Sequence, residues 1–480
     1  MIKTARAFLQ LFSFVLIALI ALIALPLSGW AAGPRQPNIV YLLVDDLGVR
    51  DLSCYGSEFH ESPNIDRLAS QGMQFSNAYA SHPVCGPSRS STMTGKFPAR
   101  MNVVHVGGKI PEGETIWPKV LQRNGYATYF LGKWHMGNQS VNEHGFDVNI
   151  GGHSGGQPGS YYFPYKNPRG KEQPPGLDDG KPGDYLTDVL TDKALALMEK
   201  NGDKPFLLYM SYYNVHTPSI GKKEHVGHFK KKLESMPKVD SLFKEERVAG
   251  SYEFKALQHQ RHPEFAGQIR AVDDSVGRIL AKLDELGIAD NTLVIFTSDQ
   301  GSKYEGRYAV SCSHPYRYGK GALFEGGLRV PFIARWLSQI DAGTKNDTVT
   351  INTDVYPTML DVAGLPKKPE QHADGISIIE TFKGKTLPFD RTFYFAFPLK
   401  RILMPALAVR KGPYKLIHFP FVNATELYNV EEDISERNDL SQSDPQRTAE
   451  MFKLMTDWKP TSSILASVEE ASLKNEKSQH

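Results

Sequence analysis

Carboxylates and one amide stand at two widely separated points of the chain and could bind a metal ion together. Asp45 and Asp46 follow one apolar segment, and Asp299 and Gln300 follow another. A hard divalent cation such as Ca²⁺ takes about six to eight oxygen ligands, which carboxylates and amide carbonyls supply. An Asp-Asp pair alone is also typical of a turn or a helix cap. The second pair favours a cation site, because clustered carboxylates repel one another unless a cation offsets the repulsion.

A cysteine, three cationic side chains and two histidines form a second group of candidates. Cys85 and Arg89 lie in Cys85-Gly86-Pro87-Ser88-Arg89, which Thr94-Gly95 follows. The others lie in three short strings: Gly132-Lys133-Trp134-His135, His216-Thr217-Pro218 and Gly319-Lys320-Gly321. Cationic groups stabilise oxyanions, and imidazoles transfer protons. A lone cysteine or histidine is more often structural, so the elements that position these residues decide their interpretation.

Apolar segments that end in these polar strings predict a parallel sheet. Residues 37–44, 126–131, 205–213 and 292–297 are nearly all apolar, which is typical of strands buried on both faces. Apolar residues at helical spacing predict helices over 186–198 and 269–286. Strands that alternate with helices predict an α/β fold with a doubly wound, mostly parallel sheet. Ligands bind beyond the carboxyl ends of such strands, so we expect the polar strings to converge on one pocket.

The chain divides into three predicted parts. Residues 1–31 read as a signal peptide, with a basic start, an apolar run from Phe8 to Leu27 and a cleavage point after Ala31. An uncleaved membrane anchor stays open, because this run approaches the length of a bilayer span. Residues 35–390 form the main domain. Residues 391–480 form a small α+β domain with an antiparallel sheet and a helix around 446–458, and the residues after 460 are expected to fray.

Composition and charge limit the classes of partner. The chain has 480 residues, of which 40% are hydrophobic and 22% charged, as in an ordinary globular protein. Without Lys3 and Arg6 of the predicted signal peptide, 53 basic residues face 53 acidic ones, which gives no electrostatic case for nucleic acid.

The Lys-rich segment 222–262 either guides an anionic chain or is a solvated loop and helix, and we favour the second. We expect Cys54 and Cys312 to be free and partly buried.

The string around Cys85 resembles the signature of the type I sulfatases, Cys-x-Pro-Ser-Arg followed by Thr-Gly. The resemblance covers nearly the whole mature chain, in order and in spacing, and points to the exported bacterial polysaccharide sulfatases of the alkaline-phosphatase-like superfamily. The family commonly has asparagine where Gln300 stands; glutamine keeps the amide oxygen but lengthens its reach. The matching strings are Asp45-Asp46, residues 132–135, residues 216–218, Ser298-Asp299-Gln300-Gly301 and residues 319–331.

The resemblance implies a calcium-dependent sulfuric ester hydrolase. A separate maturation enzyme would oxidise Cys85 to formylglycine (3-oxoalanine), whose hydrated form attacks sulfur and later expels the covalent sulfate. The implied calcium ligands are Asp45, Asp46, Asp299, Gln300 and the modified residue 85.

The resemblance also implies a role for each remaining candidate. Arg89 braces the formylglycine and the metal, and Lys133 and Lys320 hold the sulfate. His135 contacts a formylglycine hydroxyl and acts as a base, while His216 helps to protonate the leaving group. His153 is a sixth candidate. It either lines the substrate pocket or has no role there, and the two alternatives stay equally open.

The implied substrate is a sulfated carbohydrate, with a galactose- or N-acetylgalactosamine-type sulfate as the narrower expectation and small aryl sulfates as artificial substrates. The implied location is periplasmic or secreted, without a stable membrane partner.

Two alternative functions stay open. A phosphatase or phosphodiesterase of the same superfamily would use Ser or Thr as nucleophile and usually two metals. A catalytically silent protein that binds sulfated glycans would keep Cys85 as a thiol.

Overall fold

The computed structural model describes residues 36–468 apart from 139, 167–173, 250–251, 304–309, 399–403 and 467. The predicted signal peptide, residues 1–31, therefore lies outside the described residues. Within the described ranges, no helix is both long and apolar enough to cross a bilayer.

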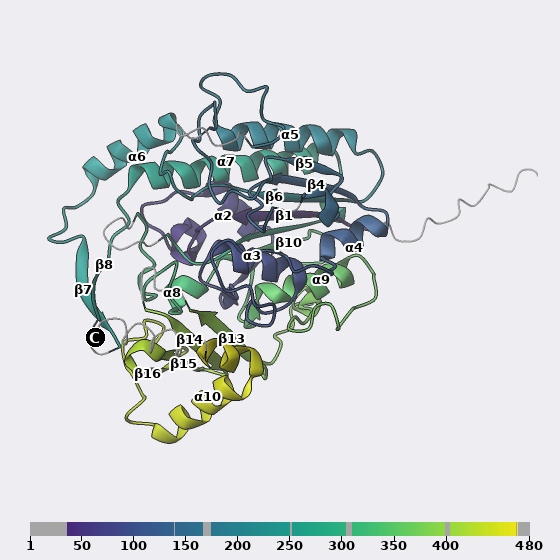
Figure 1. The fold of residues 1–480 in the computed structure, drawn as a ribbon. Coiled ribbons are helices and arrows are strands. Elements are labelled where there is room, and N and C mark those ends of the chain that lie inside the picture. The colour runs from purple at the N-terminus through teal and green to yellow at the C-terminus, as the bar shows by residue number, and fades with distance from the viewer. Residues whose placement is uncertain are drawn as a thin grey trace, which may run out of the picture. The chain divides into compact units, whose positions relative to one another are not determined.

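A mostly parallel sheet forms the centre of the main domain (Figure 1). Its eight described strands lie in the order β11-β2-β10-β9-β1-β6-β4-β5. Strands β9, β1, β6, β4 and β5 run parallel, whereas β10 is antiparallel to both of its neighbours. The bounds are β1 Asn38–Val44, β2 Met73–Phe75, β4 Ala127–Gly132, β5 Val148–Ile150, β6 Phe206–Ser211, β9 Thr292–Ser298, β10 Phe332–Arg335 and β11 Thr344–Asn346.

Helices cover both faces of this sheet, which confirms the predicted doubly wound α/β fold (Figure 1). One face packs against α2 (Pro63–Ser70), α5 (Leu186–Lys200) and α7 (Pro263–Glu285), with α6 (Lys223–Ser235) beside α7. The other face packs against α3 (Cys85–Thr94), α4 (Trp117–Arg123) and α9 (Val355–Val362). The strands β1, β6 and β9 are buried along their whole length, as their continuous apolar runs predict.

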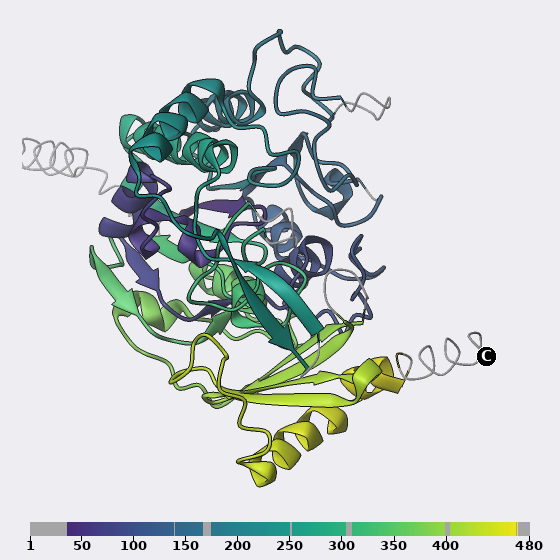
Figure 2. The ribbon, with the colours of Figure 1, turned by 90° about the vertical axis from the view of Figure 1, so that its left-hand side faces the viewer.

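A smaller antiparallel sheet with one helix follows near the C-terminus, as predicted (Figures 1 and 2). Its strands are β13 (Thr392–Phe397), β14 (Ala406–Lys411), β15 (Tyr414–Phe419) and β16 (Ala424–Asn429). Successive side chains along each strand point to opposite faces of this sheet. One face, with Phe395 and Ile417, packs against Tyr79 and Phe324 of the main domain, and the other packs against α10 (Pro445–Asp457).

Short elements complete the described fold. The strands β3 (Ala78–Tyr79) and β12 (Thr350–Ile351) pair in parallel, and α8 (Glu325–Leu328) is a single turn. Short 3-10 helices span Val49–Asp51, Ser53–Tyr55, Asn142–His144, Ala289–Asn291, Asn352–Asp354, Ile379–Lys383 and Pro420–Val422.

Two expectations about local structure are wrong. Segment 222–262 contains α6 and also an antiparallel hairpin, β7 (Phe243–Val248) with β8 (Tyr252–Leu257), beside the C-terminal sheet (Figure 2). Half of the residues in its two strands are charged, so no continuous apolar run indicates them. The chain also stays helical over 459–466, where Ile464 and Leu465 are buried against the C-terminal sheet.

Candidate active site

The carboxyl ends of the parallel strands bring the predicted residues together. Asp45 follows β1, Lys133 follows β4, His216 follows β6 after a short turn, and Asp299 follows β9. These four positions belong to adjacent strands of one sheet, so segments distant in sequence share one edge. Lys320, from the loop before α8, reaches the same place by contacting Asp46.

Three buried carboxylates form the floor of the site. The side chains of Asp45, Asp46 and Asp299 are 0% exposed. Asp46 has a φ of +61°, in the left-handed region that non-glycine residues rarely adopt. Its backbone N–H donates to Asp299 Oδ1 at 3.1 Å, which ties the end of β1 to the end of β9. The backbone itself therefore helps to hold the two acidic pairs side by side.

Each carboxylate is paired with a buried cation. Lys133 Nζ lies 2.6 Å from Asp45 Oδ2, and Lys320 Nζ lies 2.6 and 2.7 Å from the two oxygens of Asp46. Arg89 Nε donates to Asp299 Oδ2 at 2.7 Å, and its NH2 lies 3.5 Å from Asp45 Oδ1. Each of the three cations therefore contacts at least one of the three carboxylates.

The oxygen atoms at the centre of this cluster fit a divalent cation. Asp45 Oδ1 and Gln300 Oε1 are buried and accept no hydrogen bond from a described residue. Burial raises the pKa of Asp45 well above its usual range, with Asp299 and Asp46 adding to the rise against Lys133 and Arg89. Ligand atoms of Asp45, Cys85 and Asp299 lie within 4.8 Å of one another. A cation would satisfy the orphaned oxygens and favour ionised Asp45.

Gln300 lies in the cluster, although with its amide nitrogen turned toward the acid. Its Nε2 donates to Asp46 Oδ1. The two ends of a carboxamide differ little in shape, so a half-turn of the amide would present Oε1 instead. The predicted ligand is thus within reach of Asp46, and the longer side chain does not carry it out of the site.

Cys85 is the first residue of α3 and faces a histidine. Its Sγ lies 3.2 Å from His135 Nδ1, and the residue is 2% exposed. The positive end of the ten-residue helix favours negative charge at this position. Four residues further along α3, Arg89 returns to the same cluster, because residues at i and i+4 share one face of a helix.

Both predicted histidines are neutral in this environment. Burial lowers the pKa of His135 to about 2, and the nearby charges of Lys133 and Arg89 contribute. Burial also lowers the pKa of His216 well below its usual value, with Lys320 contributing and Asp46 opposing. His216 Nε2 lies 3.7 Å from Asp46 Oδ2. Neutral imidazoles can accept a proton, and an anionic substrate beside them would favour that uptake.

His153 lies beside the site. Its backbone oxygen accepts a hydrogen bond from the His135 N–H at 3.1 Å. A Cβ at Gly156 would lie only 2.8 Å from His135 Nε2, so the loop that carries His153 packs closely on that ring. The bare glycine makes this approach possible.

Sequence reasoning assigned no role to three polar residues that hold the site in place. Ser211 Oγ accepts from Arg89 at 2.7 Å and donates to Lys133 O at 2.7 Å. Asn352 Nδ2 donates to Ser88 O at 2.9 Å and also lies within hydrogen-bond distance of Ser88 Oγ. Ser88 Oγ in turn donates to Asp299 O. Ser211 ends β6 and was recognisable by its position, whereas nothing local marks Asn352.

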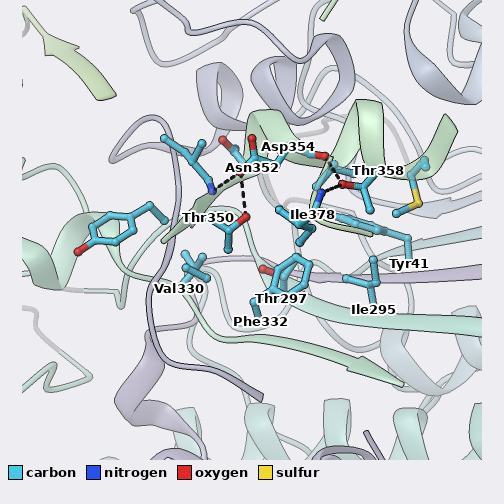
Figure 3. Close-up of a pocket in the computed structure, with 15 residues that line it drawn as sticks. Tyr41, Ile295, Thr297, Val330, Phe332, Thr350, Asn352, Asp354, Thr358 and Ile378 are labelled. Carbon is cyan, nitrogen blue, oxygen red and sulfur yellow. Dashed lines mark hydrogen bonds between the residues drawn. The ribbon is translucent and has the colours of Figure 1, made fainter. Parts of the chain in front are cut away.

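A small enclosed cavity lies beside Asn352, between the sheet and α9 (Figure 3). It has room for about 10 Å³, no more than one water molecule. The charged group on its wall, Asp354, accepts hydrogen bonds from Thr350, from the backbone N–H groups of Ile351 and Ile376, and from Arg391. This cavity is a packing feature and takes no part in the chemistry.

The predicted thiols outside the site are free. Cys54 and Cys312 form no disulfide; Cys54 is partly buried as expected, whereas Cys312 is almost fully buried at 4% exposure. Burial raises the pKa of Cys54 above its usual range, and Asp66 contributes. Neither thiol is therefore a reactive nucleophile.

The fold and the cluster define a class of protein: an α/β protein whose strand ends gather buried carboxylates and buried cationic side chains in one place. Comparison with known proteins narrows this class. The sulfatase family profile matches residues 37–365, and the profile of the N-sulphoglucosamine sulphohydrolase C-terminal region matches residues 314–459. The chain belongs to the sulfatase family, and it is a sulfuric ester hydrolase.

Relatives and solved structures agree with this assignment. Human (Homo sapiens) N-acetylgalactosamine-6-sulfatase is 30% identical over 399 residues, which cover 76% of this chain and 70% of that protein. The N-acetylglucosamine-6-O-sulfatase of Bacteroides thetaiotaomicron is 26% identical, with coverage of 85% and 83%. The crystal structure of Ps i-CgsB in complex with k-i-k-neocarrahexaose superimposes with a TM-score of 0.73 at 29% identity, covering 88% of this chain and 93% of that one.

Proposed function

We propose that this enzyme removes sulfate from a sulfated carbohydrate, using Ca²⁺ and a formylglycine made from Cys85. One observation carries the mechanism: Cys85 Sγ opens a buried helix within 4.8 Å of carboxylate oxygens of Asp45 and Asp299 and 3.2 Å from His135. The carbohydrate class is supported by relatives named as amino-sugar sulfatases and by the similar structure that binds neocarrahexaose. A galactose- or N-acetylgalactosamine-type sulfate is the narrower proposal.

The charges of the site support a divalent cation. The three buried carboxylates and the three cations that contact them balance. A bound Ca²⁺ would leave a net charge of +2, which suits a sulfate ester together with an ionised nucleophile. We propose Asp45, Asp46, Asp299, Gln300 and the modified residue 85 as its ligands. Ca²⁺ and the hydrated aldehyde together supply an oxygen nucleophile with a lowered pKa, which a thiol does not provide.

The cationic side chains orient the substrate. Lys133 and Lys320, which contact Asp45 and Asp46 in this structure, carry ammonium groups that would bind the sulfate oxygens. A bound cation would offset the charge of these two carboxylates. Arg89 stays bound to Asp299 and Ser211, so it braces residue 85 and the metal ligands instead of moving with the substrate. Donors held in a buried site stabilise developing negative charge more strongly than donors in water.

The two histidines move protons. His135 Nδ1, 3.2 Å from Sγ of Cys85, would accept a proton from a hydroxyl of the modified residue 85. His216 protonates the oxygen of the leaving alcohol. Its Nδ1 lies 3.1 Å from Thr217 O, which leaves Nε2 on the side of Asp46.

We further propose export to the periplasm or medium after cleavage behind Ala31, and maturation by a formylglycine-generating enzyme. The proposed domains are residues 35–390, which carry the catalytic groups, and 391–480. No stable membrane partner is proposed.

The experiment is incubation of the calcium-loaded, matured protein with a panel of defined sulfated oligosaccharides, one aryl sulfate and one phosphate monoester. Sulfate release from a sulfated galactose or N-acetylgalactosamine unit is the expected result. Release from the aryl sulfate alone, with the aldehyde present, rejects the carbohydrate substrate. Phosphate release that survives loss of the Cys85 modification supports the phosphatase alternative. An unmodified Cys85 peptide from the native host, together with tight glycan binding, supports the silent binder.

A further inference from the structure

A cleft of about 420 Å³ is lined in part by Arg50, four residues after Asp46 of the candidate active site. This volume lies within the range of about 300–1,000 Å³ that is usual for small-ligand sites. Its walls come from the 3-10 turns after β1, the segment after α6, the residues that follow β8 and the loop at 312–314. We call it the arginine cleft; the lining residues that matter here are Arg50, Glu58, His259, Arg261, Cys312 and His314.

Two guanidinium groups in this cleft have no carboxylate partner within the part of the chain that the structure describes. Arg50 donates to the backbone oxygens of Tyr55 and Gly56. Arg261 NH2 donates to Pro237 O, and its buried Nε has no hydrogen-bond partner among the described residues. Neither arginine forms a salt bridge with a described residue. A partly buried cation without a counter-charge is unfavourable, and a bound anion would compensate it.

Two histidines add N–H donors to the cleft. His259 and His314 are exposed at its wall. Burial lowers the pKa of His314, and the positive charges of Arg437 and Arg50 contribute to the fall, with Glu246 opposing. Glu58 is the one carboxylate among the lining residues. Cationic and N–H donor groups thus outnumber acidic ones, and planar guanidinium groups match the oxygens of a sulfate.

Hydrogen bonds connect the arginine cleft to the catalytic cluster. The N–H of Lys320 donates to Ser302 O at 2.8 Å, and Ser302 Oγ bonds to Ser313 Oγ, between Cys312 and His314. On the other wall, Gln260 Nε2 donates to Arg50 O at 2.6 Å and to Cys312 O at 3.3 Å. Ser302, which accepts the N–H of Lys320, is therefore hydrogen-bonded to Ser313, the residue between two members of the cleft wall.

Two other clefts of similar size lack this excess of positive charge. The cleft beside α10 presents Lys411, Arg447 and Lys453 together with three carboxylates from Asp390, Glu450 and Asp457. In the cleft beside α7, Lys222 pairs with Asp188, and Arg278 pairs with Asp192 outside the lining. Cations without acidic partners therefore distinguish the arginine cleft.

We propose that the arginine cleft binds a second sulfate group of the same carbohydrate chain while another sulfate occupies the catalytic cluster. This inference rests on the proposed function and narrows it to substrates that carry more than one sulfate. Arg261 is the main determinant, because its Nε is buried and without a partner, and His314 assists it from the exposed rim.

The test uses the full-length, calcium-loaded protein with the change Arg261→Gln. For a matured enzyme, we expect kcat/KM on an oligosaccharide with several sulfates to fall about tenfold, the effect of losing one charge-assisted hydrogen bond. Turnover of a monosulfated disaccharide and of an aryl sulfate should stay within about twofold of the parent, because these ligands cannot reach both sites. Arg278→Gln is the matched control, since it removes the same charge from a paired arginine, and it should leave all three substrates unaffected.

Binding to the Cys85→Ala protein, measured by calorimetry, tests the cleft without catalysis. Arg261→Gln should weaken binding of the multiply sulfated oligosaccharide, and Arg261→Lys should restore part of it. His314→Ala should also weaken binding of this oligosaccharide, but by less. This second variant tests the cleft even if Arg261→Gln does not fold. Titration with inorganic sulfate separates a free anion from a chain-borne one: the proposal predicts weak binding of sulfate alone and much tighter binding of the chain.

Equal losses on the aryl sulfate and the multiply sulfated chain would overturn the proposal, as would unchanged binding in both Arg261→Gln and His314→Ala. A parent enzyme that releases sulfate from no substrate would reject the proposed function, whereas an active parent with an insensitive Arg261→Gln variant would reject the cleft alone.

Discussion

Cys85 is a buried residue at a helix start, between a neutral histidine and two carboxylates. A structural thiol needs apolar neighbours only, but this one contacts His135 and lies near Asp45 and Asp299. These polar neighbours suit a charged side chain at position 85 better than a structural thiol. At the scale of single residues, the site therefore depends on the identity of residue 85 and on the oxygens around it.

Replacing Cys85 by alanine should abolish sulfate release, by roughly 10³-fold or more, the scale of loss typical of a missing nucleophile. The reason is that alanine supplies no side chain for oxidation to the aldehyde. Sulfate release from an aryl sulfate measures the loss. Cys54→Ser, a thiol outside the site, is the control and should keep parental activity; residual turnover in Cys85→Ala near the parental rate would contradict the assignment.

Calcium should stabilise the folded protein through the carboxylate cluster. Ligand at a hundredfold excess over its Kd raises the free energy of unfolding by about 2.7 kcal/mol. A thermal melt with added Ca²⁺, compared with one in a chelator, measures this shift independently of activity. Asp299→Asn should remove most of the shift, because it replaces a carboxylate ligand and frees Arg89 from its partner. A Tm that responds to Ca²⁺ equally in the parent and in Asp299→Asn would place the ion elsewhere.

At the scale of elements, the position of α3 against the strand ends decides whether Cys85 and Arg89 face the site. Ser88 on α3 bonds to the backbone of Asp299, and Asn352 clamps the same turn of the helix from the far side. Arg89 then reaches β4 and β6 through Lys133 O and Ser211 Oγ. A helix, three strand ends and a short turn thus form one hydrogen-bonded unit.

Asn352→Ala should lower the free energy of unfolding by about 1–3 kcal/mol, because buried groups on Ser88 and Thr92 lose a partner. It should also lower kcat more than it raises KM. The reason is that α3, which carries Cys85, loses its position, whereas the groups proposed to bind the sulfate, Lys133 and Lys320, keep theirs. Denaturant unfolding and steady-state kinetics measure the two effects. Gln446→Ala, which removes an exposed amide hydrogen bond to Glu450 Oε1, is the control. Parental kcat in Asn352→Ala would show that the clamp has no positioning role.

Much of this arrangement is predictable from the sequence, for a physical reason. Strands buried on both faces must be apolar throughout, so β1 and β9 are visible as runs, and the first polar residues after them, Asp45 and Asp299, mark the site edge. The hairpin β7–β8 is not visible, because charged side chains cover its strands. Asn352 and the arginine cleft cannot be predicted from the sequence for another reason. Each depends on contacts between segments far apart in the chain, which no local sequence pattern indicates.

At the scale of the whole molecule, buried charges join the C-terminal sheet to the main domain. Lys415 Nζ on β15 lies 2.7 Å from Glu325 Oε1 on α8 and 2.6 Å from Glu436 Oε1, and all three side chains are fully buried. Tyr79 OH also donates to Glu325. Helix α8 lies just after the loop that carries Lys320, so the C-terminal sheet supports the loop that reaches the catalytic cluster.

This junction should make stability depend on pH. Burial raises the pKa of Glu436 from an ordinary value near 4.5 to about 7, with Glu325 adding to the rise and Lys415 opposing it. Because the folded state holds this proton more tightly than the unfolded chain, its stabilising contribution is complete below about pH 4.5 and is lost as the pH rises through about 7.

Glu436→Gln mimics the protonated carboxyl, so it should flatten the fall in unfolding free energy between about pH 5 and 7. Denaturant titrations at several pH values measure the slope. Glu432→Gln, on the exposed turn nearby, is the control and should keep the parental slope. The same slope in the parent and in Glu436→Gln would contradict the assignment of the proton to this residue.

The measurement closest to the central claim compares sulfate release with the fraction of Cys85 converted to the aldehyde. Preparations of the calcium-loaded protein with graded conversion, quantified by mass spectrometry of the Cys85 peptide, are assayed on one sulfated oligosaccharide that the enzyme accepts. The proposed mechanism predicts a rate proportional to the converted fraction that vanishes at zero conversion. An equal rate in unconverted protein would show that the carboxylates and cations around Cys85 serve a different nucleophile.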